Sequence, residues 1–552
     1  MKQILFIFIA LCCTIPAAGQ KWFKKARKTQ LNVITYDAQG QLLASTNGVY
    51  INANGTALSD YDAFKGAARA VVIDESGKEF PVECIVGADA MFNVVTFRVS
   101  TKKAAALPLA SKSLTIGAAA YIMPYVSSKA NVTNATTISA AEKHDNKYDY
   151  YTLPIRTEDK SISCPVVNED GELLGILQPS VKKENEKSFV ISAQYVSQLH
   201  TNALSARNAE YRDILIRKQL PEDAEQASSF IYLCGTQDTS LYLDYVADFI
   251  KAFPNRTEGY TMKAEMLAAY QRYNEANDSW NAGIKAKCAE DELRYSKART
   301  IFGQVQTGRQ LPDDWTLENA LTEADKAFAI NPLPVYTALL GHILYAQKRY
   351  DEACGKFLAV NETNMRSAEY FLYAAQCRQI QADTLGTLAL QDSAVACFTQ
   401  PYRIEAATSL LMRAQTLLVL ERYREAVADL NSYERLKLND LTANFYYQRE
   451  QAEINCRMFQ QALNDIERAA RMEPSEPLYQ AEMSSLYYRF GYIDQAVTAA
   501  QAAIALDDTF ADAHRILGVC YRSQGKTAEA RAALERAAQL GDTRAETLLQ
   551  EL

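Results

Sequence analysis

Two stretches near the carboxyl end decide the fold of the larger part of this chain. Residues 484–503 read SSLYYRFGYIDQAVTAAQAA, and residues 518–537 read GVCYRSQGKTAEARAALERA. In both, a small residue is followed three places later by a tyrosine, then by a glycine turn and an alanine. The alanines in this register are spaced by 36, 34 and 34 residues: Ala426, Ala462, Ala496 and Ala530. Small residues let paired helices approach closely, so the register predicts a repeated pair of helices.

The period and the pattern resemble the tetratricopeptide repeat. Earlier stretches fit the register more loosely, and the resemblance covers about residues 223–545 as eight or nine repeats. It implies an all-α solenoid in which the first helix of each repeat lines a concave groove. It also implies that places 2, 5, 9, 12 and 13 of a repeat face that groove, counted here from Ala443, Pro477 and Ala511.

These groove places carry tyrosines and arginines, which are enriched at binding hot spots. The resemblance therefore predicts that the groove binds an extended or helical segment of a partner protein, and the arginines favour an acidic one. The residues expected to bind it are Tyr447, Gln451, Tyr488, Arg489, Arg515 and Arg522. Relatives that clamp a C-terminal carboxylate have Asn at the ninth place. Here the ninth places are Gln451, Ser485 and Val519, so no such clamp is expected. The alternative is a solvated, empty concave face.

Before about residue 205 the pattern of apolar and turn-forming residues is different. Short β-branched runs alternate there with Gly, Asn and Asp turns, which is typical of an all-β barrel or sandwich. The runs are Leu31–Tyr36, Gly48–Asn52, Ala70–Ile73, Val82–Val86, Val94–Val99 and Ala118–Met123.

Four segments of this part, in the right order, resemble trypsin-like proteases, especially the Deg/HtrA kind. Residues 47–59 resemble the strand and turn before the family's histidine, and residues 76–89 the hairpin before its aspartate. Residues 168–176 resemble the hairpin after its serine, and residues 188–199 the closing strand and helix. The resemblance implies a double β-barrel over residues 20–205.

The same resemblance places other residues at the three catalytic positions. Asp62 stands where the histidine belongs, and Asn93 stands where the aspartate belongs. The serine position falls on Ile162, or on Ser163 if one residue is deleted. A serine hydroxyl needs an adjacent base near neutral pKa, which a carboxylate does not provide efficiently. The sequence therefore predicts a pseudo-protease with no catalytic residues.

Two catalytic alternatives remain open. Cys164 could act as a cysteine nucleophile, or Ser163 could have an unrecognised base. The chain has four histidines, and only His144 lies within the barrel proper, since His200 follows the closing helix. The slipped alignment also puts Pro165, which has no N–H, in the loop that should supply donors to an oxyanion.

Residues 1–19 have the features of a secretory signal. Lys2 precedes an apolar run, and Ala17-Ala18-Gly19 offers small residues for cleavage, so the mature chain should begin at Gln20. A lipoprotein with an acylated Cys12 or Cys13 is the weaker alternative, because Leu11 precedes Cys12. No other segment is apolar enough to cross a membrane.

The composition excludes several further classes. The formal net charge is -8, which does not favour a nucleic-acid partner. The nine cysteines after the signal are scattered singly, without the spacing of a metal site, and no cofactor motif is present. An odd number leaves at least one thiol unpaired in a monomer.

The predicted organisation is multidomain β plus α. It has a signal at 1–19, a trypsin-like barrel at 20–205, a linker helix at 206–222 and a tetratricopeptide-repeat solenoid at 223–552. The predicted function is non-catalytic protein binding in the periplasm, in the cell envelope or outside the cell. The alternatives are a divergent serine or cysteine endopeptidase whose repeats recruit substrate, and an assembly scaffold with several partners.

Overall fold

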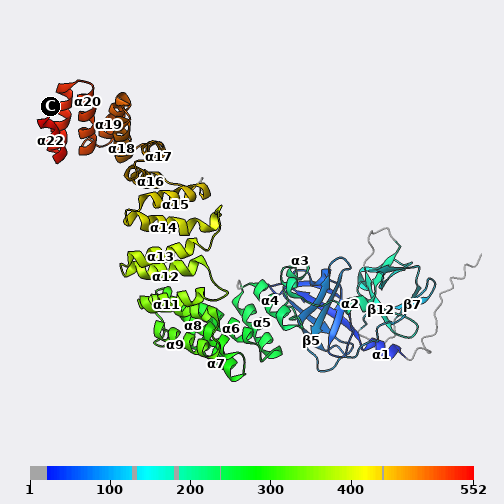
Figure 1. Cartoon of the computed structure of the whole chain (residues 1–552). Coiled ribbons are helices and arrows are strands. Elements are labelled where there is room, and N and C mark those ends of the chain that lie inside the picture. Colours follow the sequence, from blue (N-terminus) through cyan, green and yellow to red (C-terminus); the bar gives the residue numbers. More distant parts are fainter. Residues whose placement is uncertain (1–21, 127–132, 179–185, 236–237, 438–439) are drawn as a thin grey trace, which may run out of the picture. The chain divides into compact units, whose positions relative to one another are not determined.

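The structure is a computed structural model, and it describes residues 22–126, 133–178, 186–235, 238–437 and 440–552 (Figure 1). The predicted signal and its cleavage site lie outside the described residues. The chain forms two compact units, Met1–Ala289 and Glu290–Leu552, which we call the N-terminal and C-terminal units. None of the described helices is long and apolar enough to cross a membrane.

The first sheet of the N-terminal unit is a closed barrel with the strand order β1-β2-β3-β6-β5-β4. Helix α1 (Phe23–Arg27) precedes it, and all neighbouring strands pair antiparallel. The strands are β1 (Gln30–Tyr36), β2 (Leu42–Tyr50), β3 (Thr56–Ser59), β4 (Arg69–Ile73), β5 (Glu79–Asp89) and β6 (Val94–Val99). The short 3-10 helix η1 (Asp62–Phe64) follows β3.

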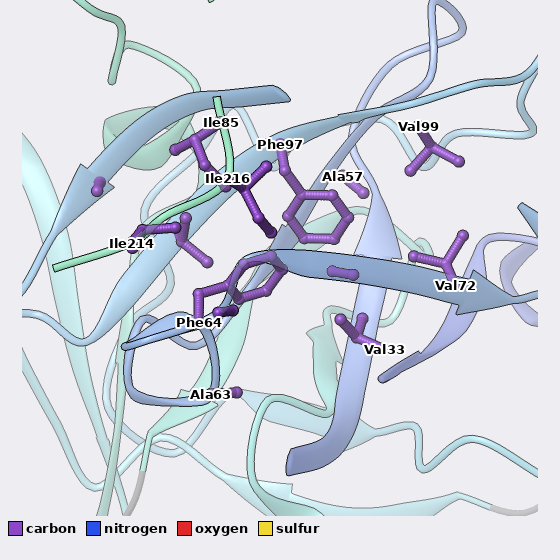
Figure 2. Close-up of a cluster of buried hydrophobic side chains, with 14 of the residues drawn as sticks. Val33, Ala57, Ala63, Phe64, Val72, Ile85, Phe97, Val99, Ile214 and Ile216 are labelled. Atoms are coloured by element: carbon purple, nitrogen blue, oxygen red, sulfur yellow. The ribbon is translucent and has the colours of Figure 1, made fainter. Parts of the chain in front are cut away.

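Apolar side chains from these strands fill the barrel. Phe64 and Phe97 are fully buried with their ring centroids 5.0 Å apart, and Val33 and Val72 come from β1 and β4 (Figure 2). Phe64 comes from η1, whereas period-2 alternation in the β-branched strands points the strand residues inward. The prediction of an all-β first part is confirmed.

The second sheet is barrel-like and seven-stranded, with the order β8-β7-β11-β12-β13-β10-β9. Its strands are β7 (Ala119–Ile122), β8 (Asn134–Thr137), β9 (Ala140–His144), β10 (Tyr148–Leu153), β11 (Pro165–Val167), β12 (Leu173–Gln178) and β13 (Ser188–Ile191). The 3-10 helix η2 (Asp159–Ser161) precedes β11, and helix α2 (Ala193–Val196) follows β13.

The segment at 206–222 does not form the predicted linker helix. It contains only the four-residue helix α3 (Ala209–Arg212), after the 3-10 helix η3 (Ala203–Ala206). The chain then extends, and Ile214 and Ile216 insert their side chains into the core of the first barrel (Figure 2). Two residues further on, Lys218 forms a parallel bridge with Ile85. The segment is therefore part of the barrel.

Helices follow to the end of the chain. The N-terminal unit contains α4 (Ala224–Cys234), α5 (Thr239–Ala252), α6 (Thr257–Ala269) and α7 (Tyr273–Lys285). The C-terminal unit contains α8 (Glu290–Gln306), α9 (Leu317–Ile330), α10 (Pro334–Ala346), α11 (Tyr350–Asn361), α12 (Ala368–Ile380), α13 (Thr384–Val395), α14 (Ala407–Val419), α15 (Tyr423–Leu436), α16 (Ala443–Asn455), α17 (Phe459–Met472), α18 (Pro477–Arg489), α19 (Ile493–Leu506), α20 (Ala511–Ser523), α21 (Thr527–Gln539) and α22 (Thr543–Gln550), with the 3-10 helix η4 (Ile404–Ala406) before α14.

The predicted register explains why the helices pair. The eighth place of a first helix is small because the second helix lies against it. A Cβ added to Gly518 would lie 2.6 Å from Cγ of Leu534, and one added to Gly341 would lie 2.7 Å from Cε1 of Phe357. The all-α repeat array predicted after the barrel is confirmed.

Candidate functional site

The positions predicted for the histidine and the aspartate lie together and are joined by a backbone-to-side-chain hydrogen bond. Asp62 begins η1 and is exposed, and its backbone N–H donates to Oδ1 of Asn93 at 2.8 Å. Asn93 has φ of 50° in the turn between β5 and β6, a left-handed conformation that Asn tolerates. The amide of Asn93 thus anchors the start of η1.

Ser163 is instead paired with a carboxylate that the sequence reasoning missed. Its Oγ donates to Oδ2 of Asp60 at 2.6 Å, and Oγ1 of Thr46 donates to the same oxygen at 2.8 Å. The other oxygen of Asp60 accepts the backbone N–H of Ala63 at 2.9 Å. Asp60 is 6% exposed and Ser163 is fully buried. The hydroxyl proton is therefore committed to an internal acceptor.

The backbone around Ser163 is equally committed. The N–H of Ser163 donates to the carbonyl of Leu177 at 2.8 Å, and the N–H of Ser161 donates to that of Glu158 at 2.8 Å. The N–H of Cys164 bonds to the carbonyl of Ser161 at 3.2 Å. An oxyanion hole needs N–H groups aimed at empty space beside the nucleophile. In this loop the backbone N–H groups of Ser161, Ser163 and Cys164 already donate to carbonyl groups of the chain.

The two other residues considered for the nucleophile position, Cys164 and Ile162, are held by packing and by hydrogen bonds. Cys164 is fully buried in an apolar cluster, and burial raises the pKa of its thiol to about 12. A thiol with that pKa holds almost no thiolate near neutral pH, so it is a poor nucleophile. Ile162 contributes its carbonyl, which accepts from Nδ2 of Asn47 at 2.8 Å.

His144, at the end of β9, lies in an aromatic cluster. The ring of His144 is 4.6 Å from that of Phe92 and 5.0 Å from that of Tyr195, and its Nε2 is 3.5 Å from Oδ2 of Asp145. None of its described contacts reaches Ser163. Across the described residues, no group of three or more His, Cys, Asp and Glu side chains is arranged to hold a metal ion.

The predicted groove residues lie on neighbouring first helices of the C-terminal unit. Tyr447 of α16 has its ring 5.5 Å from that of Tyr479 in α18. Tyr488 of α18 accepts a hydrogen bond at its hydroxyl from Oγ of Ser523 in α20, at 3.2 Å. These contacts place the three helices side by side, with Tyr447 and Tyr488 both partly exposed. We call this set of places on α16, α18 and α20 the groove face.

The charges on the groove face are mostly paired within the chain. Nε of Arg515 donates to Asp542 at 2.6 Å, and a second guanidinium nitrogen contacts Asp512. Arg522 lies 3.3 Å from Glu551. Arg489 is exposed and stacks 4.3 Å above the ring of Phe459, with no ion pair among the described residues. The arginine that best suits an acidic partner is therefore Arg489.

Behind this face lie carboxylates that the sequence reasoning did not single out. Glu450 is fully buried, and Nε2 of Gln451 donates to its Oε2 at 2.8 Å. Burial, followed by the charge of Glu482, raises the pKa of Glu450 to about 8. The signal was visible in the sequence, because Glu450 stands at the eighth place, where other repeats have Gly341, Ala414, Ser484 and Gly518.

Comparison with known proteins first concerns the N-terminal barrel part. The family model described as a trypsin-like peptidase domain matches residues 46–176. No curated protein matches the chain. One similar solved structure is described as "Crystal structure of YrrB: a TPR protein with an unusual peptide-binding site". It has 20% sequence identity and a TM-score of 0.31, and the match covers 36% of this chain and 98% of that one. Residues 46–176 are thus similar to a trypsin-like peptidase domain, as predicted. The all-α repeat array after them rests on the 34-residue register and on the helix pairs described above.

Proposed function

We propose that the protein binds other proteins through the groove face and does not hydrolyse peptides. The observation that carries the second half is the pairing of Ser163 with Asp60. A buried hydroxyl has no access to a substrate, and its proton is held by a carboxylate that also accepts from Thr46 and Ala63. Mutational loss of triad members lowers turnover on the order of 10⁴- to 10⁶-fold in enzymes that use them.

The alternative is a divergent serine or cysteine endopeptidase whose repeats recruit substrate. The full chain, incubated with a fluorophosphonate probe and separately with casein, tests it. We expect no labelling and no cleavage. Labelling that disappears in Ser163→Ala, or alkylation-sensitive cleavage that disappears in Cys164→Ala, would establish the alternative. The matched control is Ser161→Ala, in the same loop.

The binding half of the proposal rests on the two tyrosines and Arg489. Partly exposed tyrosines offer large contact area at small entropic cost, and an unpaired guanidinium adds directional donors. A photo-crosslinking amino acid at Ser485, which is exposed at the ninth place of α18, should capture a partner from the native cell envelope. The same amino acid at the exposed Arg531 of α21 is the control.

A triple variant then asks whether the groove face is the binding surface. Tyr447→Ala, Tyr488→Ala and Arg489→Ala together should abolish capture and leave the circular-dichroism melt nearly unchanged. The control triple is Tyr270→Ala, Tyr492→Ala and Arg531→Ala. Tyr270 and Tyr492 are 53% and 51% exposed between helices, and Arg531 is exposed on α21. Equal capture by both triples would move the binding surface elsewhere, and several partners crosslinking at once would support the assembly scaffold.

We also propose that the protein acts outside the cytoplasm, in the periplasm, in the cell envelope or beyond it. The support is the apolar run after Lys2 and the small residues at 17–19. Mass spectrometry of the protein from its native cells should find Gln20 at the N-terminus. An acylated Cys12 or Cys13 would make it a lipoprotein, and an intact Met1 would overturn export.

A further inference from the structure

A small polar pocket lies among α12, α13 and α14 of the C-terminal unit, with a volume of about 240 Å³. Its rim is exposed and includes Gln379, Gln415 and Val419. In the repeat register these are the twelfth place of α12 and the ninth and thirteenth places of α14, which are groove-facing places. The pocket therefore opens where a segment bound along the first helices would pass.

The floor of the pocket is formed by three buried polar side chains, Thr387, Gln391 and Thr416, which are 1%, 1% and 6% exposed. Elsewhere in the repeats these places are apolar. Thr387 is the fourth residue of its second helix, where six other second helices have Ala276, Ala353, Ala426, Ala462, Ala496 and Ala530.

The other two floor positions depart from the repeat in the same way. Gln391 is the eighth residue of α13, where the same six helices have Trp280, Phe357, Leu430, Ile466, Ala500 and Leu534. Thr416 is the tenth residue of α14, where six other first helices have Met266, Ile343, Cys377, Ala452, Leu486 and Cys520. Three polar replacements of core residues, all around one pocket, indicate a built site.

The hydrogen bonds of the floor determine what it can bind. Oγ1 of Thr387 donates to the carbonyl of Asp383 at 2.7 Å, and Oγ1 of Thr416 donates to that of Met412 at 3.3 Å. Both hydroxyl protons are thus used inside the helices, and their lone pairs remain. Oε1 of Gln391 is buried and has no partner among the described residues. The floor therefore presents acceptors that need a donor.

We propose that this pocket binds the carboxamide side chain of an asparagine or glutamine in the partner segment. Its NH₂ group would donate to Oε1 of Gln391 and to a threonine hydroxyl, and the glutamines of the rim can donate to its oxygen. A lysine would bring a charge into a pocket whose lining residues are all neutral, which costs more than burying an amide. An aliphatic side chain would leave Gln391 Oε1 unpaired.

The proposal rests on the function proposed above, and a random peptide library displayed on phage separates the two. We expect the full wild-type chain to select peptides enriched in Asn or Gln at one position. Gln391→Leu should lose that enrichment and bind the selected peptides about tenfold more weakly, as for the loss of a buried hydrogen bond. This variant should fold, because Leu430 and Leu534 occupy the same place in other repeats.

The outcomes separate the two proposals. Peptides selected with no Asn or Gln preference, with a Lys preference, or with equal affinity for Gln391→Leu would overturn the pocket and leave groove binding intact. Selection of no peptide would remove both. Propionamide serves as a probe that needs no partner. The methyl signal of Met412, which lines the pocket, should shift with propionamide in methyl NMR and stay unchanged in Gln391→Leu. No shift in the wild type would also overturn the proposal.

Discussion

The loop around Ser163 and the repeats around Gln391 and Glu450 both bury polar groups, but the two regions differ in how many of these groups have hydrogen-bond partners. In the barrel, both oxygens of Asp60 are paired, and the hydroxyl and N–H of Ser163 have partners. In the repeats, one oxygen each of Gln391, Glu450 and Glu453 has no partner among the described residues. In the proposed pseudo-protease the pairings of the barrel favour stability and leave the hydroxyl of Ser163 no free proton. Unpaired buried polar atoms lower stability, and we expect them where a function maintains them.

The largest effect should come from Arg449, the best-paired charge in the repeats. Its guanidinium holds Asp465 with two hydrogen bonds of 2.6 and 2.8 Å and also contacts Glu434, while its side chain is 4% exposed. Arg449→Ala would leave the buried Asp465 without its cation, whereas Glu434 keeps Arg468, so the free energy of unfolding should fall by about 3–5 kcal/mol. Urea denaturation of the full chain, followed by circular dichroism, measures it.

Arg413→Ala is the matched control, because Arg413 holds Asp429 in the same way with two bonds of 2.7 Å. Its side chain is more exposed, at 21%, so its loss should be smaller. An equal loss for both arginines would show that burial does not set the strength of this pairing.

Asp60→Ala should give the next largest effect, in the N-terminal unit. It would strip partners from Ser163, Thr46 and the N–H of Ala63 at once, at a cost of about 2–3 kcal/mol in the free energy of unfolding. Differential scanning calorimetry should show the transition of the barrel at lower temperature. A transition that does not move would mean that the closed site adds nothing to stability, which would break the contrast with the repeats.

A pH dependence follows from the buried acids of the repeats. Burial raises the pKa of Glu450 and of Glu453 to about 8, above the ordinary value of 4.5. The folded state thus holds protons that the unfolded state releases, so the contribution of these two groups to stability is greatest below pH 4.5 and is lost as pH rises from 4.5 to 8. Each such group lowers the free energy of unfolding by about 1.4 kcal/mol per pH unit there.

Glu450→Gln tests this assignment. Urea midpoints at pH 6, 7 and 8 should fall less steeply in the variant than in the wild type, and the variant should be the more stable protein at pH 8. A slope that is the same in both proteins would exclude Glu450 as a source of the dependence.

Ser163→Ala should give the smallest effect. The serine has one hydroxyl partner, Asp60, which keeps its bonds from Thr46 and Ala63, so the loss should stay below about 1 kcal/mol. Calorimetry under the conditions used for Asp60→Ala measures it. A larger loss than for Asp60→Ala would reverse the roles that the geometry gives to the two residues.

The sequence predicted the two folds because each depends on a short-range pattern. The 34-residue register placed Ala462, Ala496 and Ala530 at helix contacts, and β-branched alternation predicted the barrel strands. The register also held the exceptions, since Glu450 and Gln391 stand at places that are small or apolar elsewhere. Their significance needed the structure, because only the fold shows that they are buried.

Other details depend on where side chains point. Counting along the chain put Asp62 at the histidine position, which stays a prediction, but it gave no sign that Asp60, two residues earlier, reaches Ser163. The prediction of a linker helix was wrong. The alternation of Ile214 and Ile216 is the period of an extended strand, yet we expected a helix across 206–222. Apart from Tyr211, the other members of the core that both residues fill lie more than 100 positions earlier, and local pattern carries no information about that distance.

The extended segment with Ile214 and Ile216 has a consequence for how the chain can be divided. The barrel's own strands end at Val99, but its core is not complete until residue 216 has been made, and Lys218 then bonds through its backbone N–H to the hydroxyl of Tyr245 in α5 at 2.8 Å. During synthesis the core of the barrel is therefore complete only after residue 216, more than 100 residues beyond its last strand. A fragment that ends at residue 205 would expose the apolar space that Ile214 and Ile216 fill. A fragment that continues through α5 would include both isoleucines and the hydroxyl of Tyr245 that holds Lys218.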